Sequence, residues 1–214
     1  MMKKNLIVLL AFVIGLNLNA QKTVSAVFNK EETVIWFGLD FTNAQFVGIA
    51  PNSADEAGDI KDKWIPSWNK LMVAETKKFN VTKFFKKASA FYDFDSVDKL
   101  NKDIDESKIV VRSSKLLENP KELAAKSIAH YESESSNDGL GMVYLVEYFD
   151  KHKEEASFYV VFFDIASKEI LLCERVTAPP AGFGIRNHWA GSVYNSMKFV
   201  SKKKWKAWRK QYLN

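Results

Sequence analysis

The stretch that decides the fold is GMVYLVEYFDKHKEEASFYVVFFDIASKEILLCERVT, at residues 141–177. It contains three runs rich in β-branched and aromatic residues, and short polar segments separate them. These runs predict strands at Met142–Phe149, Ala156–Ile165 and Glu169–Thr177. Connections this short join only antiparallel neighbours, so the three strands are expected to form one antiparallel unit.

The flanking segments extend this unit into an α+β domain. Thr33–Thr42 is apolar on both alternating faces, as a central strand is, apart from Asp40. A loop rich in Pro and Gly at 178–184 leads into a long C-terminal helix from about Asn187. Strands and helices are grouped and do not strictly alternate, which favours α+β. We therefore predict a mainly antiparallel sheet of about four to five strands, with helices packed on it.

The middle of the chain predicts shorter elements. Apolar residues at helical spacing indicate a helix over Trp64–Phe79, and Thr82 is a candidate cap for a short helix through Phe91. Ile109–Val111 is a short strand candidate. The sequence Asn119-Pro120-Lys121-Glu122 indicates a helix start, because Asn caps, Pro suits the first helical position and Glu completes a capping box.

The first 20 residues have the pattern of a signal peptide. Two lysines precede an apolar run at Leu6–Leu16, which is too short to cross a bilayer of about 30 Å. Leu18 and Ala20 stand at the −3 and −1 positions of an A-x-A-like cleavage site, and no cysteine follows for a lipoprotein anchor. We expect cleavage near Ala20, and an exported chain of residues 21–214 that is periplasmic or secreted and folds as a single domain.

Composition also limits the classes of protein and of partner that fit this chain. Loss of Lys3 and Lys4 lowers the formal net charge from +5 to +3, and the 47% apolar content is typical of a folded domain. No later run is apolar enough for a transmembrane helix, and export argues against a nucleic-acid partner. Cys173 is the only cysteine, so no internal disulfide forms, and its strand-like surroundings predict a buried, unreactive thiol.

One candidate site is the turn at Gly182–His188. Gly182 and Gly184 precede a helix start, where free backbone N–H groups favour an anion. Arg186 adds a bidentate partner for a carboxylate or phosphate, and Asn187 and His188 complete the set. The pattern matches neither the P-loop nor the dinucleotide fingerprint. The favoured structural interpretation is a tight strand-to-helix turn that Asn187 caps.

The second candidate is the basic, aromatic tail at 202–214. On a helix Trp205, Trp208 and Tyr212 form one aromatic stripe flanked by cations that include Arg209. Such a helix suits contact with an anionic envelope surface or a protein partner. The favoured structural interpretation is that the stripe closes over the domain's own core, because two exposed tryptophans leave a large apolar area in water.

The sequence contains no motif for catalysis or for a cofactor. The nucleophile elbow and the Ser-x-x-Lys motif with its companions are absent. Among the histidines, His130 has a potential ligand at metal-pair spacing in Glu134, and this combination is weak. The aspartates between Asp93 and Asp105 lack the glycine and terminal glutamate of an EF-hand loop. We predict no metal or cofactor, and we favour a non-enzymatic role.

Several segments carry a family resemblance. WFGLDFTNAQFVG at 36–48, IPSWNKL at 65–71 and GFGIRNHWA at 182–190, with the strand unit, resemble a group of small exported Bacteroidetes proteins without an assigned activity. More loosely, residues 141–200 are similar to the small α/β modules of Tol-type and curli-secretion periplasmic proteins. Those modules bind proteins, so this resemblance implies a binding role.

The sequence thus supports two hypotheses about function. The first is an exported non-enzymatic domain that acts through protein or envelope contacts. The second is a small anionic-ligand binder or an enzyme that uses the Gly182–His188 turn.

Overall fold

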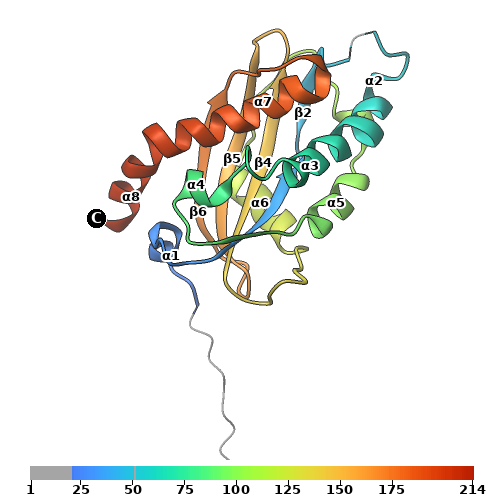
Figure 1. The fold of residues 1–214 in the computed structure, drawn as a ribbon. Coiled ribbons are helices and arrows are strands. Elements are labelled where there is room, and N and C mark those ends of the chain that lie inside the picture. Colours follow the sequence, from blue (N-terminus) through green and yellow to red (C-terminus); the bar gives the residue numbers. More distant parts are fainter. Residues whose placement is uncertain (1–20, 51) are drawn as a thin grey trace, which may run out of the picture.

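The computed structural model describes residues 21–50 and 52–214, so the signal peptide predicted at 1–20 lies outside the described part. Its centre is a six-stranded sheet in the order β3-β1-β4-β5-β6, with β2 pairing with β4 beyond the end of β1 (Figure 1). The strands are β1 (Val34–Asp40), β2 (Gln45–Val47), β3 (Ala90–Tyr92), β4 (Leu140–Asp150), β5 (Glu155–Asp164) and β6 (Ile170–Ala178).

Helices cover both faces of this sheet. The α-helices are α1 (Val24–Phe28), α2 (Glu56–Gly58), α3 (Ile65–Ala74), α4 (Val81–Phe85), α5 (Asp95–Lys102), α6 (Pro120–Ile128), α7 (Gly184–Phe199) and α8 (Trp205–Leu213). Two π-helical turns, η1 (Asp59–Trp64) and η3 (Val200–Lys204), and one 3₁₀ turn, η2 (Glu106–Lys108), complete the elements. In Figure 1, α3, α4 and α7 lie in front of the sheet and α6 lies behind it.

The α+β class and the long C-terminal helix are confirmed, but the sheet is mixed. The predicted unit appears as β4, β5 and β6, and each of these strands runs antiparallel to the next one. However, β1 runs parallel to both β3 and β4, and β2 runs parallel to β4. The prediction of a mainly antiparallel sheet of four to five strands was therefore wrong. The two missed strands have only three residues each, too few to show a periodic pattern.

Three local predictions also differ from the structure. The helix expected from Thr82 to Phe91 begins at Val81, with Asn80 as its N-cap. It ends at Phe85, because the next residue, Lys86, has a left-handed backbone. At Ile109–Val111 only Val110 pairs, with Phe46, as an isolated bridge. Helix α6 does begin at Pro120, but Asn119 has a left-handed backbone and its side chain makes no capping hydrogen bond.

The alternation of side chains along the strands creates two cores. Met142, Tyr144 and Val146 of β4 face the larger core, which α1, α3, α4, α7 and α8 cover. Val143 and Leu145 face the smaller core, which α5 and α6 close. Since both faces are covered, β4 and β5 are buried along nearly their whole length.

The last thirty residues form one continuous helix with a π-helical turn in its middle. It begins at Gly184, three residues before the predicted Asn187. The turn η3 joins α7 to α8 and shifts the buried stripe around the axis. This shift keeps Met197 and Val200 in α7–η3, and Trp205 and Trp208 in α8, on the larger core.

Two buried asparagines complete the end of β1, where β3 no longer runs beside it. Asn69 Oδ1 accepts the Leu39 N–H at 2.9 Å, and Asn69 Nδ2 donates to the Leu39 carbonyl at 3.1 Å. Asn101 Oδ1 accepts the Phe41 N–H at 2.8 Å. These side chains take the place of a neighbouring strand, so α3 and α5 are fixed against β1.

A buried lysine makes the stability of the fold pH-dependent. The Lys87 ammonium donates to the carbonyls of Ala26 and Asn29 at 2.8 and 2.9 Å, at the end of α1. Burial lowers the pKa of Lys87 from 10.5 to about 8, against the opposing effect of Glu32. The native state therefore holds fewer protons than the unfolded chain between these values, and its stability should rise with pH across that window.

We expect the free energy of unfolding to increase by roughly 3 kcal/mol between about pH 8 and pH 10.5, and to be flat in this respect below pH 8. Urea unfolding at a series of pH values measures the slope. Burial raises the pKa of several tyrosines, to about 12 for Tyr148, Tyr159 and Tyr212, so their contribution to stability falls as the pH rises past about 10. Lys87→Met is therefore the matched control that removes only the lysine contribution. Equal slopes in both proteins would contradict the prediction.

Candidate functional site

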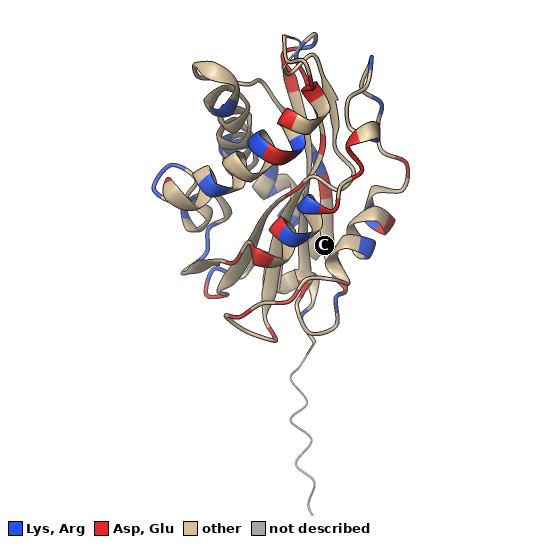
Figure 2. Cartoon of the chain, turned by 90° about the vertical axis from the view of Figure 1, so that its right-hand side faces the viewer, with Lys and Arg blue, Asp and Glu red and all other residues tan. Residues whose placement is uncertain are grey.

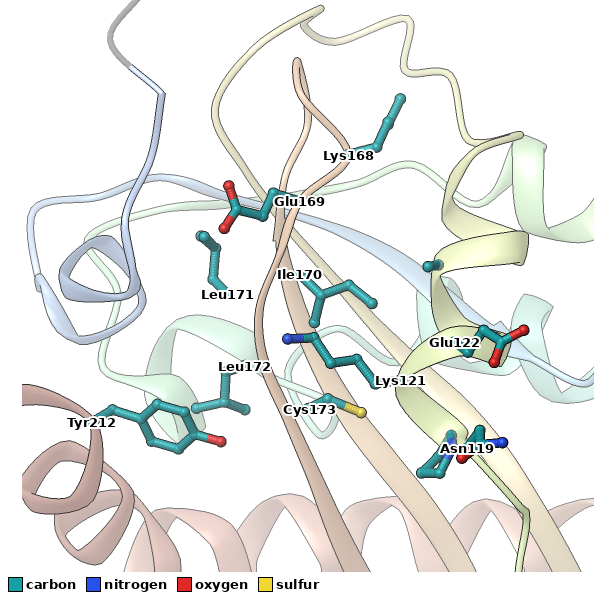
Figure 3. A pocket seen from close by; sticks show the side chains of 12 residues that line it. Asn119, Lys121, Glu122, Lys168, Glu169, Ile170, Leu171, Leu172, Cys173 and Tyr212 are labelled. Carbon is teal, nitrogen blue, oxygen red and sulfur yellow. The ribbon is translucent and has the colours of Figure 1, made fainter.

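A groove of about 680 Å³ runs along the outer edge of β6. Helix α6 forms one wall, and Tyr212 of α8 stands at the other side (Figure 3). We call this the β6 groove. Its lining consists of Asn119, Pro120, Lys121, Glu122, Ala125, Lys168, Glu169, Ile170, Leu171, Leu172, Cys173 and Tyr212.

The groove exists because β6 is the last strand of the sheet. It pairs only with β5, so alternate residues turn their N–H and C=O groups away from the sheet. The Glu169 carbonyl points inwards, where it accepts the Asp164 N–H at 2.9 Å. The alternation then places the backbone N–H and C=O of Ile170 on the open side.

The side chains of β6 provide apolar surfaces on both sides of this edge. Ile170 and Cys173 point towards α6, whereas Leu171 and Leu172 point to the opposite side (Figure 3). Two consecutive leucines share one side because the register shifts here, between Phe162 and Phe163 of β5. Because Ile170, Leu171 and Leu172 are 8%, 9% and 1% exposed, their side chains fill the two cores, and the bulged edge of β6 forms the floor of the groove.

The lining carries two lysines, one thiol, the carboxylates of Glu122 and Glu169 and the Tyr212 hydroxyl. Lys121 extends over the groove beside Cys173, and within the described residues it has no ion-pair partner (Figure 3). The Lys168 ammonium already has a hydrogen-bond partner, because it donates to the Tyr131 carbonyl. Burial, assisted by Glu174, raises the pKa of the Cys173 thiol to about 11. The thiol is therefore protonated at neutral pH, where it is a poor nucleophile.

A buried carboxylate braces β6 from the side of the smaller core. Glu147, fully buried at a bulge in β4, accepts from Arg175 Nε of β6 at 2.6 Å. Ser157 Oγ and the Leu117 N–H also donate to it, at 2.6 and 2.8 Å. Because its acceptors are occupied, this glutamate holds the strands together and has no free position for a ligand.

The predicted turn at Gly182–His188 forms, but its polar groups contact each other. Gly182 and Gly184 have φ values of +113° and +76°, which only glycine adopts readily. His188 Nδ1 lies 3.3 Å from the Gly182 carbonyl, and its Nε2 lies 3.4 Å from Glu154 of the β4–β5 hairpin. The Nδ1 atom thus contacts the residue's own loop, while Nε2 lies near the hairpin carboxylate without a hydrogen-bond partner among the described residues.

The remaining residues of this turn do not converge on one point. Arg186 and Asn187 are exposed, and Arg186 Nε donates weakly to Asn187 Oδ1 at 3.4 Å. The Arg186 carbonyl accepts the indole N–H of Trp68 at 3.0 Å, which fixes the first turn of α7. Asn187 lies inside the helix, because α7 already begins at Gly184, so its predicted capping role was wrong.

The aromatic residues of the tail lie largely inside the protein. Trp205 and Trp208 are 4% and 3% exposed, so nearly all of their side-chain surface lies in the domain's own core. Trp205 packs on the rings of Phe28 and Phe85, with centroids 5.2 and 5.6 Å away. The contact surface predicted on this stripe is therefore corrected, and the interpretation as core is the right one. Tyr212 is half-buried, and Arg209 is exposed.

The described residues contain neither a metal-binding cluster nor a membrane-spanning helix. Among residues 21–50 and 52–214, no three His, Cys, Asp or Glu side chains gather to hold a metal ion. Over the same residues, no helix combines the length and apolar character needed to cross a bilayer.

The sequence predicted the strand that forms the groove but not its position at the edge. Edge position depends on the partners of β1 and β4, which are far apart in the chain. No protein-family model, curated protein or solved structure matches this chain. The resemblance to exported Bacteroidetes proteins and to Tol-type modules stays a prediction.

Proposed function

We propose that this protein is an exported, non-enzymatic binding domain that takes an extended peptide into the β6 groove as an added strand. The observation that carries the proposal is the open backbone edge at Ile170–Cys173, with the groove around it. An exposed strand edge supplies a ladder of main-chain donors and acceptors, which an incoming strand satisfies.

The accessible lining residues give this edge a means of selection. Side chains of an added strand alternate between two faces, so one set would lie on the α6 side beside Ala125 and Cys173, and the other set on the side of Tyr212. Lys121 stands above the α6 side without an ion-pair partner in the described chain. The preferred peptide is therefore apolar at alternate positions and carries an acidic residue opposite Lys121.

The chemistry of the lining supports binding without catalysis. Its thiol is protonated at neutral pH, its second lysine is engaged by a carbonyl, and no histidine is among the lining residues. A nucleophile activated by a neighbouring base is thus missing from this groove. The anionic-ligand alternative at Gly182–His188 has weaker support, because His188 and Arg186 contact groups of the turn and of the neighbouring hairpin.

A substitution that fills the groove tests the proposal. Ala125 is exposed on α6 and lines the groove, so Ala125→Trp should block it without disturbing the core. A library of displayed random peptides is selected against the full chain, and the enriched peptide becomes the probe. We expect Ala125→Trp to weaken its binding at least about tenfold in fluorescence anisotropy. Ala207→Trp, at an exposed position of α8, is the matched control and should bind normally.

Backbone hydrogen exchange gives a second, independent measurement. Strand addition should slow exchange of the Ile170 amide in the complex, since that N–H gains a partner. Lys121→Glu should weaken the binding of acidic peptides, whereas Lys99→Glu on α5, which is exposed and outside the lining, should not. Undiminished binding to Ala125→Trp, or unchanged exchange along β6, would overturn the proposal. A dimer that Ala125→Trp abolishes would instead identify a second copy as the occupant.

A further inference from the structure

The C-terminal helix has a strong charge asymmetry. Residues 184–214 contain eight Lys and Arg residues and no Asp or Glu. Six of these cations are exposed on η3, α8 and the end of α7, and we call them the basic face: Lys198, Lys202, Lys203, Lys206, Arg209 and Lys210. None of the six forms an ion pair within the described part of the chain.

The core fixes the direction of this face. Trp205 and Trp208 lie on the opposite side of the helix, buried against the sheet and α1. The helix cannot rotate about its axis without removing both indoles from the core, so the cations stay turned to solvent. The face is therefore held ready for a partner, with no folding step needed on binding.

Neighbouring residues add positive charge beside α7 and η3, and they add a negative charge near the chain end. Helix α4 packs against α7 and η3, and it adds the exposed Lys83 and Lys86. Near the chain end, Glu174 of β6 accepts a hydrogen bond from Tyr212 at 2.9 Å and lies beside Gln211. By contrast, blue and red residues are mixed over the side of the molecule that faces the viewer in Figure 2.

We infer that the basic face binds the surface of an anionic phospholipid bilayer. Five of its six cations are lysines, whose compact, hydrated charge suits a diffuse anionic surface, whereas arginine suits bidentate recognition of single phosphates. Phe199 and Leu213, which are 39% and 41% exposed, stand at the two ends of the face and supply apolar groups for the interface.

This inference is independent of the peptide groove and has its own test. The full chain is mixed with vesicles of phosphatidylcholine alone, or of phosphatidylcholine with phosphatidylglycerol, and floated on a density gradient. We expect flotation with the anionic vesicles only, declining as salt is raised. The variant Lys202→Gln/Lys206→Gln/Lys210→Gln should lower the partition coefficient roughly 100-fold.

A matched variant distinguishes the effect of charge on the basic face from the effect of the protein's net charge. Lys63→Gln/Lys99→Gln/Lys115→Gln removes the same charge from exposed positions in other elements and should bind nearly as the wild type does. Residues 1–20 are common to all three proteins, so their contribution cancels. Equal loss in both variants, equal binding to phosphatidylcholine alone, or tighter binding to duplex DNA at the same salt would overturn the inference. Circular dichroism confirms that each variant is folded.

Discussion

Replacing Trp205 with alanine should lower the free energy of unfolding by about 3–5 kcal/mol, the cost of deleting a large side chain from a packed core. Trp205 is 4% exposed and contacts elements from three separate parts of the chain. Its ring lies 5.2 Å from Phe28 of α1, 5.6 Å from Phe85 of α4 and 6.0 Å from Phe162 of β5. The substitution removes all three contacts and leaves a cavity between α8 and the sheet.

The midpoint of urea unfolding measures this effect. Lys206→Ala is the control, because Lys206 is the next residue on the same helix and its side chain is exposed. We expect the control to change stability by no more than about 0.5 kcal/mol. A Trp205→Ala protein that kept its stability but no longer bound vesicles would show that the indole is a contact residue and would contradict its assignment to the core.

The tail shows what a single helix pattern can and cannot predict. Aromatic residues at i, i+3 and i+7 with cations between them are expected both for a helix on a membrane and for one that closes a core. The sequence alone left both interpretations open. The decision depends on whether an apolar sheet face lies nearby, and Phe162 of β5 supplies that face. In the structure the two indoles are buried in the core and the flanking cations of the basic face are exposed.

The sheet shows the same division between local and distant information. The strands β4, β5 and β6 were predicted within a few residues, because short connections fix their pairing. The position of β1 between β3 and β4 depends on long connections, and β3 consists of only Ala90–Tyr92. Parallel pairing across such distances leaves no signal in either strand alone. The open edge of β6, and with it the groove, could not be predicted for this reason.

In the candidate sites, too, local features were predictable from the sequence and contacts between distant segments were not. The glycines at 182 and 184 predicted a tight turn correctly, since their positive φ values are a local property. The partners of the turn were not predictable, because Glu154 and Trp68 come from other elements. Glu147 lies in an apolar strand of the sequence, but the donors of its three shortest hydrogen bonds come from three separate segments.

Replacing Glu147 with alanine is the second change with a large expected effect. The substitution leaves Arg175 without its partner at 2.6 Å, and it leaves Ser157 Oγ and the Leu117 N–H without an acceptor. Removing one member of a buried ion pair costs about 3–5 kcal/mol. A third of the Arg175 side chain is exposed, so water compensates in part and we expect the lower limit, about 3 kcal/mol.

The control and a double variant separate the charge from the packing. Glu134→Ala removes an exposed carboxylate that has no ion pair in the described part of the chain and should have little effect on the urea midpoint. The double variant Glu147→Leu/Arg175→Met replaces both charges with apolar groups, and we expect it to recover most of the lost stability. If the double variant were as unstable as Glu147→Ala, the hydrogen bonds from Ser157 and Leu117 would be the main contribution. In that case Glu147 would stabilise the bulge of β4, and the brace to β6 through Arg175 would be secondary.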